Sequence, residues 1–194
     1  MGKKTKMKIP IEISARHIHL CQEDLENLFG KGYKLKSQRK LSQADEFAAQ
    51  ETLTMVGPKG KFKNVRIVGP MRDQTQVEIS RTDGYKLGDI PSLRISSDVT
   101  GSAPITLIGP EGKVELKEGL ICAKRHIHMN PKEAEKFGVK DRQIVSLKIS
   151  GKRALTFHDV IVRVKPGFKT TLHLDTDEAN AGWIEMGDEG ELVK

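Results

Sequence analysis

Four of the six histidines in this chain stand in two copies of the tripeptide His-Ile-His, at residues 17–19 and 126–128. Residues two apart on a β-strand point to the same face, so each copy would present two imidazoles on one side and its isoleucine on the other. Paired neutral imidazoles are typical ligands of a transition metal. A polar surface strand with solvated histidines explains a single copy as well, but the repetition favours a metal site.

The residues around the two strings repeat as well. An arginine precedes each string, and helix-capping signals follow it. After the second string, Asn130 fits an N-cap, Pro131 the first helical position and Gly138 the C-terminal end. Glu133 would complete a capping box, and residues 24–30 are a looser version of the same pattern. We therefore expect each string to be the end of a strand that leads into a helix.

Aligning the first part of the sequence with the second adds two further candidate ligands. Residues 75–80 align with residues 170–175, and Glu78 and His173 then occupy equivalent places among apolar neighbours. A carboxylate in such a place is costly unless it is paired or bound to a cation. The candidate metal ligands are His17, His19, Glu78, His126, His128 and His173.

Five imidazoles and one carboxylate are too many ligands for one four-coordinate zinc ion and suit two metals that share a carboxylate. Nitrogen and oxygen ligands fit Zn²⁺, with Co²⁺, Ni²⁺ or Mn²⁺ as alternatives. If the strand continued unbroken from Cys122 to His128, Cys122 would point to the same face as the two histidines and could be a further ligand. We prefer the interpretation that it is a small buried thiol. His158 lies outside the repeats and is expected to be a surface or structural residue.

Composition places the chain among globular proteins. Hydrophobic residues make up 37% of the 194 residues, the mean hydropathy is -0.45, and no apolar run approaches the length of a membrane span. Residues 1–10 carry lysines without an apolar segment, which is not a secretory signal. We therefore expect a cytoplasmic protein in which Cys21 and Cys122 are free thiols.

The net charge of +7 favours an anionic partner. Nucleic acid is disfavoured because the positive residues are spread along the chain, aromatic residues make up only 5%, and no zinc finger, RNP-type string or long basic helix is present. A phosphorylated small molecule fits the charge equally well.

Short β-branched, alternating segments separated by Gly-Pro and Pro-Gly turns predict a mainly β protein with short helices, built as two small β-barrels by internal duplication. A polar excursion is expected at about residues 31–50. The overlay also places residues 65–67 on residues 162–164. The predicted strands are 51–56, 65–68, 75–80, 105–108, 144–149, 160–164 and 170–174.

Four longer strings identify a family that this chain resembles. They are residues 14–20, 69–80, 125–131 and 173–180, and the similarity runs from Ile9 to about Trp183. On these strings the chain is similar to the PduL-type phosphotransacylases, also called phosphate propanoyltransferases. The resemblance implies an acyltransferase that interconverts propanoyl- or acetyl-CoA plus phosphate with acyl phosphate plus coenzyme A.

The resemblance also implies roles for individual residues. His17 and His19 would bind one zinc ion, and the histidines 126, 128 and 173 would bind a second, with Glu78 contacting or bridging the pair. Arg72 would bind phosphate and act in catalysis, and Ser96 would be a second polar contact for the phosphate.

At the level of domains, the resemblance implies one barrel from residues 6–15 plus 124–194 and another from 16–123, with the dinuclear zinc site between them. A homodimer is expected. Residues 1–8 are too short and too rich in lysine for the encapsulation helix of microcompartment members, which favours free cytoplasmic enzyme.

Two other functions use the same residues. A dinuclear zinc hydrolase would turn over phosphoesters or thioesters without added phosphate, using a metal-bound hydroxide. A binding module would use zinc only to join the barrels and would contact nucleic acid through its basic surface. The resemblance favours the acyltransferase, with acyl-CoA and phosphate as partners and without nucleic acid or a membrane.

Overall fold

The computed structural model describes residues 7–193. The chain divides into two compact units: unit 1 is Met1–Ser14 with Lys124–Lys194, and unit 2 is Ala15–Ala123. The encapsulation segment that we expected to be missing would fall mostly on residues 1–6, outside the described residues. No helix in the described part of the chain is long and apolar enough to cross a membrane.

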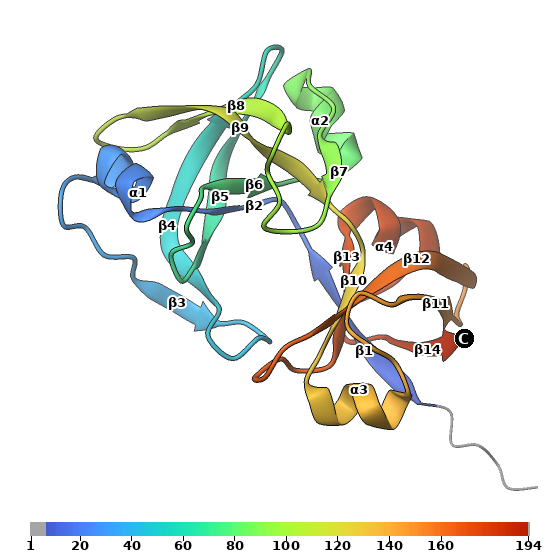
Figure 1. Cartoon of the computed structure of the whole chain (residues 1–194). Coiled ribbons are helices and arrows are strands. Elements are labelled where there is room, and N and C mark those ends of the chain that lie inside the picture. The colour runs from blue at the N-terminus through green and yellow to red at the C-terminus, as the bar shows by residue number, and fades with distance from the viewer. Residues whose placement is uncertain (1–6, 194) are drawn as a thin grey trace, which may run out of the picture. The chain divides into compact units, whose positions relative to one another are not determined.

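Unit 2 is built on a closed ring of six strands. Its order is β4-β5-β2-β6-β9-β8, and β8 pairs back onto β4. Strands β3 and β7 extend the sheet at β4 and β9 (Figure 1). The elements of unit 2 are β2 (His17–His19), α1 (Gln22–Phe29), β3 (Ser37–Lys40), β4 (Phe47–Val56), β5 (Lys61–Gly69), β6 (Gln76–Glu78), α2 (Arg81–Leu87), β7 (Ser92–Arg94), β8 (Ala103–Ile108) and β9 (Lys113–Ala123).

Unit 1 is a second closed six-stranded barrel, ordered β1-β13-β10-β12-β11-β14. Its elements are β1 (Lys8–Ser14), β10 (His126–Met129), α3 (Pro131–Phe137), β11 (Ile144–Ile149), β12 (Leu155–Val164), β13 (Thr171–Asp175), α4 (Thr176–Gly182) and β14 (Glu189–Val193). The mainly β fold with short helices and two barrels is confirmed.

The two barrels have the same topology. In each, the strand of the His-Ile-His string runs parallel to one neighbour and antiparallel to the other. In unit 2, β9 closes the barrel by pairing in parallel with β6, the strand of Glu78. In unit 1, β1 closes the barrel by pairing in parallel with β13, the strand of His173. The closing strand of unit 1, β1, precedes unit 2 in the sequence, whereas β9 of unit 2 leads directly to β10. The pairing confirms the internal duplication.

The register also tests the overlay residue by residue. His17 pairs with Glu78 and His126 pairs with His173, which confirms that Glu78 and His173 are equivalent. Ile67, however, lies opposite the isoleucine of the first string as Val162 does in the second. The overlay of residues 65–67 on 162–164 is therefore wrong by two residues. A slip of two keeps every side chain on its face, so the hydrophobic pattern could not reveal it.

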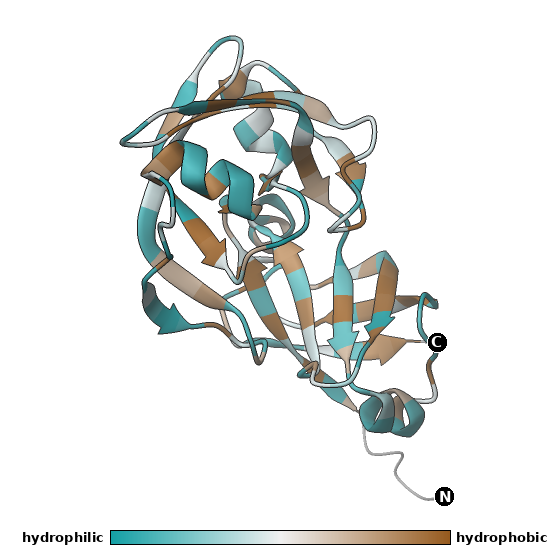
Figure 2. Ribbon diagram, turned by 60° about the vertical axis from the view of Figure 1, so that its left-hand side comes forward, coloured by the Kyte–Doolittle hydropathy of each residue, from teal (hydrophilic) through white to brown (hydrophobic). Residues whose placement is uncertain are grey.

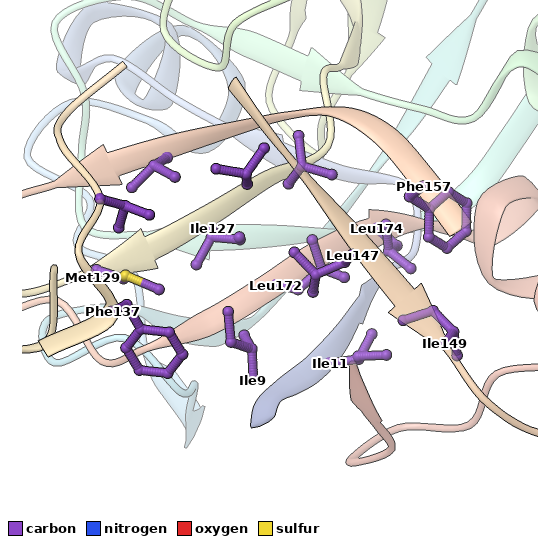
Figure 3. Close-up of a cluster of buried hydrophobic side chains, with 14 of the residues drawn as sticks. Ile9, Ile11, Ile127, Met129, Phe137, Leu147, Ile149, Phe157, Leu172 and Leu174 are labelled. Atoms are coloured by element: carbon purple, nitrogen blue, oxygen red, sulfur yellow. The ribbon is translucent and has the colours of Figure 1, made fainter. Parts of the chain in front are cut away.

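Each barrel encloses its own core. In unit 1 the core includes Ile9 and Ile11 from β1 and Leu172 from β13, all at most 2% exposed (Figure 3). The isoleucines of the two strings, Ile18 and Ile127, are fully buried, so the central residue of each string anchors its strand. Hydrophobic and hydrophilic residues alternate along several strands (Figure 2), as expected for barrels with one face toward a core.

The polar segment at residues 31–50 differs from the expectation. It contains β3, and β4 already begins at Phe47 rather than Glu51. All four side chains of β3 are exposed, so this strand lacks the alternation that identifies a half-buried strand in a sequence.

The helices after the two strings end and begin as predicted, with one exception. The Asn130 side chain accepts a hydrogen bond from the Glu133 N–H, Pro131 opens α3, and Gly138 ends it in the left-handed conformation. The exception is the capping box expected at Glu133: α3 has none, and the Glu133 carboxylate lies 3.9 Å from the Lys136 ammonium instead. The N-cap of α1 is Cys21, whose side chain makes no capping bond.

Candidate metal centre

Unit 2 brings three predicted ligands together. His17 and His19 lie on β2, and Glu78 ends β6, which pairs with β2 in antiparallel register. The His17 Nε2 atom is 3.2 Å from the His19 Nε2 atom. The carboxylate oxygens of Glu78 lie 3.7 Å from the former nitrogen and 3.8 Å from the latter. Within the described residues, these ligand atoms lie within 4.8 Å of one another, close enough to hold one ion.

Backbone carbonyls fix the orientation of both rings. His17 Nδ1 lies 2.8 Å from the Ala15 carbonyl, and His19 Nδ1 lies 3.0 Å from the Val68 carbonyl. A carbonyl only accepts, so each Nδ1 carries a proton, and in the neutral ring the lone pair is then on Nε2. Two lone pairs and a carboxylate that converge on one point repel one another unless a cation lies between them. The donor set therefore fits a transition metal.

The charges of the three groups agree with this arrangement. Burial, followed by the nearby His17 and Arg72, holds the pKa of His19 well below 6.5, so its imidazole is neutral at pH 7. Burial alone would raise the pKa of Glu78, but the neighbouring His17, His19 and Arg72, and the hydrogen bond from Ser96, lower it to about 2. Glu78 is thus an anion that favours positive charge at the point where the three ligands converge.

A polar network connects Glu78 to Arg72. Ser96 donates a hydrogen bond to Glu78 Oε1 at 2.8 Å and accepts one from Arg72 Nη1 at 3.3 Å. The Gln76 amide donates to the same Glu78 oxygen at 2.6 Å, and its own oxygen accepts from the Ser97 N–H. Arg72 and Ser96 therefore lie beside Glu78.

Unit 1 gathers the other three predicted ligands. The ring centroids of His126, His128 and His173 lie between 4.6 and 5.1 Å from one another. His126 Nδ1 is 2.8 Å from the Lys124 carbonyl, which repeats the contact that His17 makes with the carbonyl two residues before it. The register that brings His17 to Glu78 in unit 2 brings His126 to His173 here.

Sequence reasoning missed three residues around these sets. Glu12 pairs with His173 across β1 and β13, and its Oε2 atom lies 3.8 Å from His173 Nε2. Phe168 stacks on His128 with a centroid distance of 4.1 Å. Gln76 stands two residues before Glu78, and residues two apart on a strand point to the same face, so the sequence could have predicted its position beside Glu78. Glu12 comes from a distant part of the chain, and Phe168 lies outside the strands, between β12 and β13, where no strand period marks it.

The two remaining candidates are outside both ligand sets. Cys122 is buried on β9, which ends at Ala123, so the continuous strand that would align it with His126 is interrupted. His158 is exposed and its Nδ1 lies 2.8 Å from the Ser146 hydroxyl. The expectations of a buried thiol and a surface histidine are confirmed.

Comparison with known proteins identifies the family of the chain. A family model described as phosphate propanoyltransferase matches residues 10–185. The chain belongs to the phosphate propanoyltransferase family. It is 52% identical over 93% of its length to the phosphate propanoyltransferase of Thermotoga maritima, covering 86% of that protein. It is 52% identical to the protein of the same name from Priestia megaterium, with 97% and 87% coverage, and 48% identical to that from Clostridioides difficile, with 98% and 91% coverage. The predicted family and its acyltransferase class are confirmed.

Proposed function

We propose that this protein is a phosphate acyltransferase that exchanges the acyl group of a short-chain acyl-CoA, propanoyl- or acetyl-CoA, between coenzyme A and inorganic phosphate. The observation that carries the proposal is the convergence of two imidazole lone pairs and an anionic Glu78 beside Arg72, in a chain of this family. Acyl-CoA and phosphate are the proposed partners, the enzyme is proposed to be a cytoplasmic homodimer, and neither nucleic acid nor a membrane is needed.

Two zinc ions are the proposed cofactors, with Co²⁺, Ni²⁺ or Mn²⁺ as substitutes. His17, His19 and Glu78 would hold one ion, and His126, His128 and His173 the other. Bound zinc would supply a Lewis acid for the thioester carbonyl or the departing thiolate.

The side chains of unit 2 suit the binding of phosphate. The Arg72 guanidinium can donate two parallel hydrogen bonds to phosphate oxygens. Its contacts with Ser96 and Glu78 hold it beside the ligand set. Holding phosphate in line with the carbonyl requires no covalent enzyme intermediate, and positioning of this kind contributes roughly 7–11 kcal/mol.

A thiol-release assay tests the function. We expect free coenzyme A to appear from acetyl- or propanoyl-CoA only when phosphate is added, with acyl phosphate as the second product. A chelator and His128→Ala should each abolish the reaction, and metal analysis should find about two ions per chain in the wild-type protein.

The competing functions give different results in the same assay. Thiol release without phosphate would indicate a hydrolase. Salt-sensitive binding of DNA or RNA with no turnover would indicate a binding module. Either result contradicts the proposed acyltransferase.

A further inference from the structure

The arginine before each His-Ile-His string contacts a carboxylate and a phenylalanine ring in both units. In unit 2, Arg16 donates Nε and Nη2 hydrogen bonds to the two carboxylate oxygens of Asp83, at 2.9 and 2.7 Å. Its guanidinium carbon lies 4.3 Å from the centroid of the Phe62 ring. We call these three residues the unit 2 clamp.

Unit 1 repeats this arrangement. Arg125 Nε lies 2.9 Å from Glu178 Oε1, and the guanidinium carbon lies 5.3 Å from the Phe157 ring centroid. These three residues are the unit 1 clamp.

The members of the two clamps occupy equivalent positions in the duplicated fold. Each acid stands five residues after the ligand on the neighbouring strand, Glu78 or His173. Each phenylalanine stands five residues before the residue that pairs with the isoleucine of its string. Both copies have kept one arrangement of cation, acid and ring, although the acid changed from aspartate to glutamate.

Each clamp connects the two strands that carry the ligands of its unit. The arginine is directly bonded in sequence to the first histidine of the string, and the acid is the third residue of the helix that follows the strand of Glu78 or His173. The acids are themselves fixed, because the Asp83 N–H donates to Ser80 and Glu178 forms a capping box with Asp175. A tie between these elements restricts the separation of the ligands.

The clamp also lies next to the carbonyl that orients the first histidine. His17 Nδ1 donates to the carbonyl of Ala15, and His126 Nδ1 donates to that of Lys124. Each of these carbonyls belongs to the residue directly before the clamp arginine. An anchored arginine therefore limits the movement of the peptide that sets the tautomer and direction of the first imidazole.

From this geometry we infer that Arg16 and Arg125 are positioning residues, each of which sets the metal affinity of the histidine string that it precedes. The inference rests on the ligand assignment of the proposed function. Arginine suits the role because its planar fork engages a carboxylate while its face stacks on a ring, and lysine offers neither geometry.

Arg16→Lys tests the unit 2 clamp, because it keeps the charge and loses the fork. We would measure zinc affinity by chelator competition in a His126→Ala/His128→Ala background, so that only the unit 2 ligands report. The variant should bind zinc about 10- to 100-fold more weakly, as loss of a group that orients a metal ligand usually causes. The visible absorption of bound Co²⁺ should change as well, since it reports ligand geometry.

Arg125→Lys in a His17→Ala/His19→Ala background is the reciprocal test. At pH 8, Arg125→Lys should weaken metal binding by the unit 1 ligands. Arg16→Lys in the same background should leave metal binding by those ligands unchanged. An equal effect of either variant on both sets would contradict the inference, because a general loss of stability does not select one string.

Tyr33→Phe is the matched control. It removes the 2.9 Å hydrogen bond from Tyr33 to the buried Glu51 in unit 2 and touches no member of the clamp. It should lower the melting temperature and leave zinc affinity unchanged. If Arg16→Lys does not fold, Phe62→Leu keeps the ion pair, removes the stacked ring, and should weaken zinc binding several-fold.

Two results overturn the inference and can be told apart. If His19→Ala abolishes zinc binding in the unit 2 background but Arg16→Lys keeps the original affinity and cobalt spectrum, the clamp does not position the string. If His19→Ala itself leaves zinc binding unchanged, the ligand assignment is wrong and the role of the clamp is lost with it.

Discussion

At the scale of the residue, the two ligand sets differ most at one pair of equivalent positions. Glu78 faces His17 where His173 faces His126. One set therefore carries a negative charge next to Arg72, and the other is built from imidazoles. The charged set can hold an arginine in place through Ser96, which gives unit 2 the phosphate-binding role in our proposal.

Arg72→Lys should raise the KM for phosphate about 10- to 100-fold, because hydrogen bonds to charged groups contribute roughly 1.5–3 kcal/mol and lysine cannot form the fork. The KM for acyl-CoA should change little. Steady-state kinetics with each substrate varied in turn measures both. Arg66→Lys is the control, since Arg66 donates to the carbonyls of Ala49 and Gln50. An unchanged phosphate KM in Arg72→Lys would contradict the assigned role.

The proposed ligands stand out in the sequence because they repeat at short spacing and because a carboxylate among apolar residues is unusual. The clamps could not be predicted from the sequence, although Arg16 and Arg125 repeat as the residues directly before the two strings. Arg16 reaches Asp83 across 67 positions, and an aspartate at the start of a helix is common enough to attract no notice. Arg72 and Ser96 were found only through the resemblance to the family.

At the scale of the element, capping residues determine where a helix begins and ends. The left-handed Gly138 and the Asn130 cap limit α3 to seven residues. Such signals are local, which is why the bounds of α3 could be predicted closely from the sequence. The predicted strands did not include β3, β7, β9 or β14. Strand β3 is exposed throughout and β7 has only three residues, so neither shows a clear alternation.

Asn130→Ala should reduce the free energy of unfolding by about 1 kcal/mol, the usual effect of losing an N-cap. Chemical denaturation of the metal-free protein measures it. Cys21→Ala is the matched control, because the Cys21 side chain at the N-cap of α1 makes no capping bond. Equal losses in the two variants would contradict the assigned cap.

Glu178→Gln tests the electrostatics at the start of α4. Burial and then the Asp175 carboxylate raise the pKa of Glu178 to about 7, against the Asp175 N–H and Arg125, which lower it. The folded protein thus holds a proton that the unfolded chain has released above pH 4.5, so stability falls as pH rises from about 4.5 to 7. The glutamine variant cannot release this proton. Between pH 5 and pH 8 its free energy of unfolding should therefore rise by roughly 2 kcal/mol relative to that of the wild type. Unfolding at both pH values measures the difference, and a parallel decline in the two proteins would contradict it.

At the scale of the whole molecule, two barrels of identical topology share one chain in an unusual order. Unit 2 is continuous in sequence, whereas unit 1 needs β1 from the start of the chain to close between β13 and β14. The alternation of residues predicted barrels, but the partner of β1 is more than 150 positions away and came from the resemblance. We propose that each unit is a cooperative folding domain.

Ile11→Ala should destabilise unit 1 by about 2–4 kcal/mol, because Ile11 is 2% exposed in the core of that barrel. Hydrogen exchange should show lost protection in β10 to β14 and unchanged protection in unit 2. Leu107→Ala, in the core of unit 2, should give the reverse pattern. Loss of protection throughout the chain in either variant would show that the two units unfold together.

The position of β1 has a consequence during synthesis on the ribosome. β1 is translated first, but both strands that flank it in the barrel come from the last quarter of the chain. At about 5–20 residues per second, this strand waits on the order of ten seconds or longer with its backbone groups unpaired. Lys8 and Pro10, a charge and a residue without an N–H, protect such a waiting edge from pairing with other nascent chains.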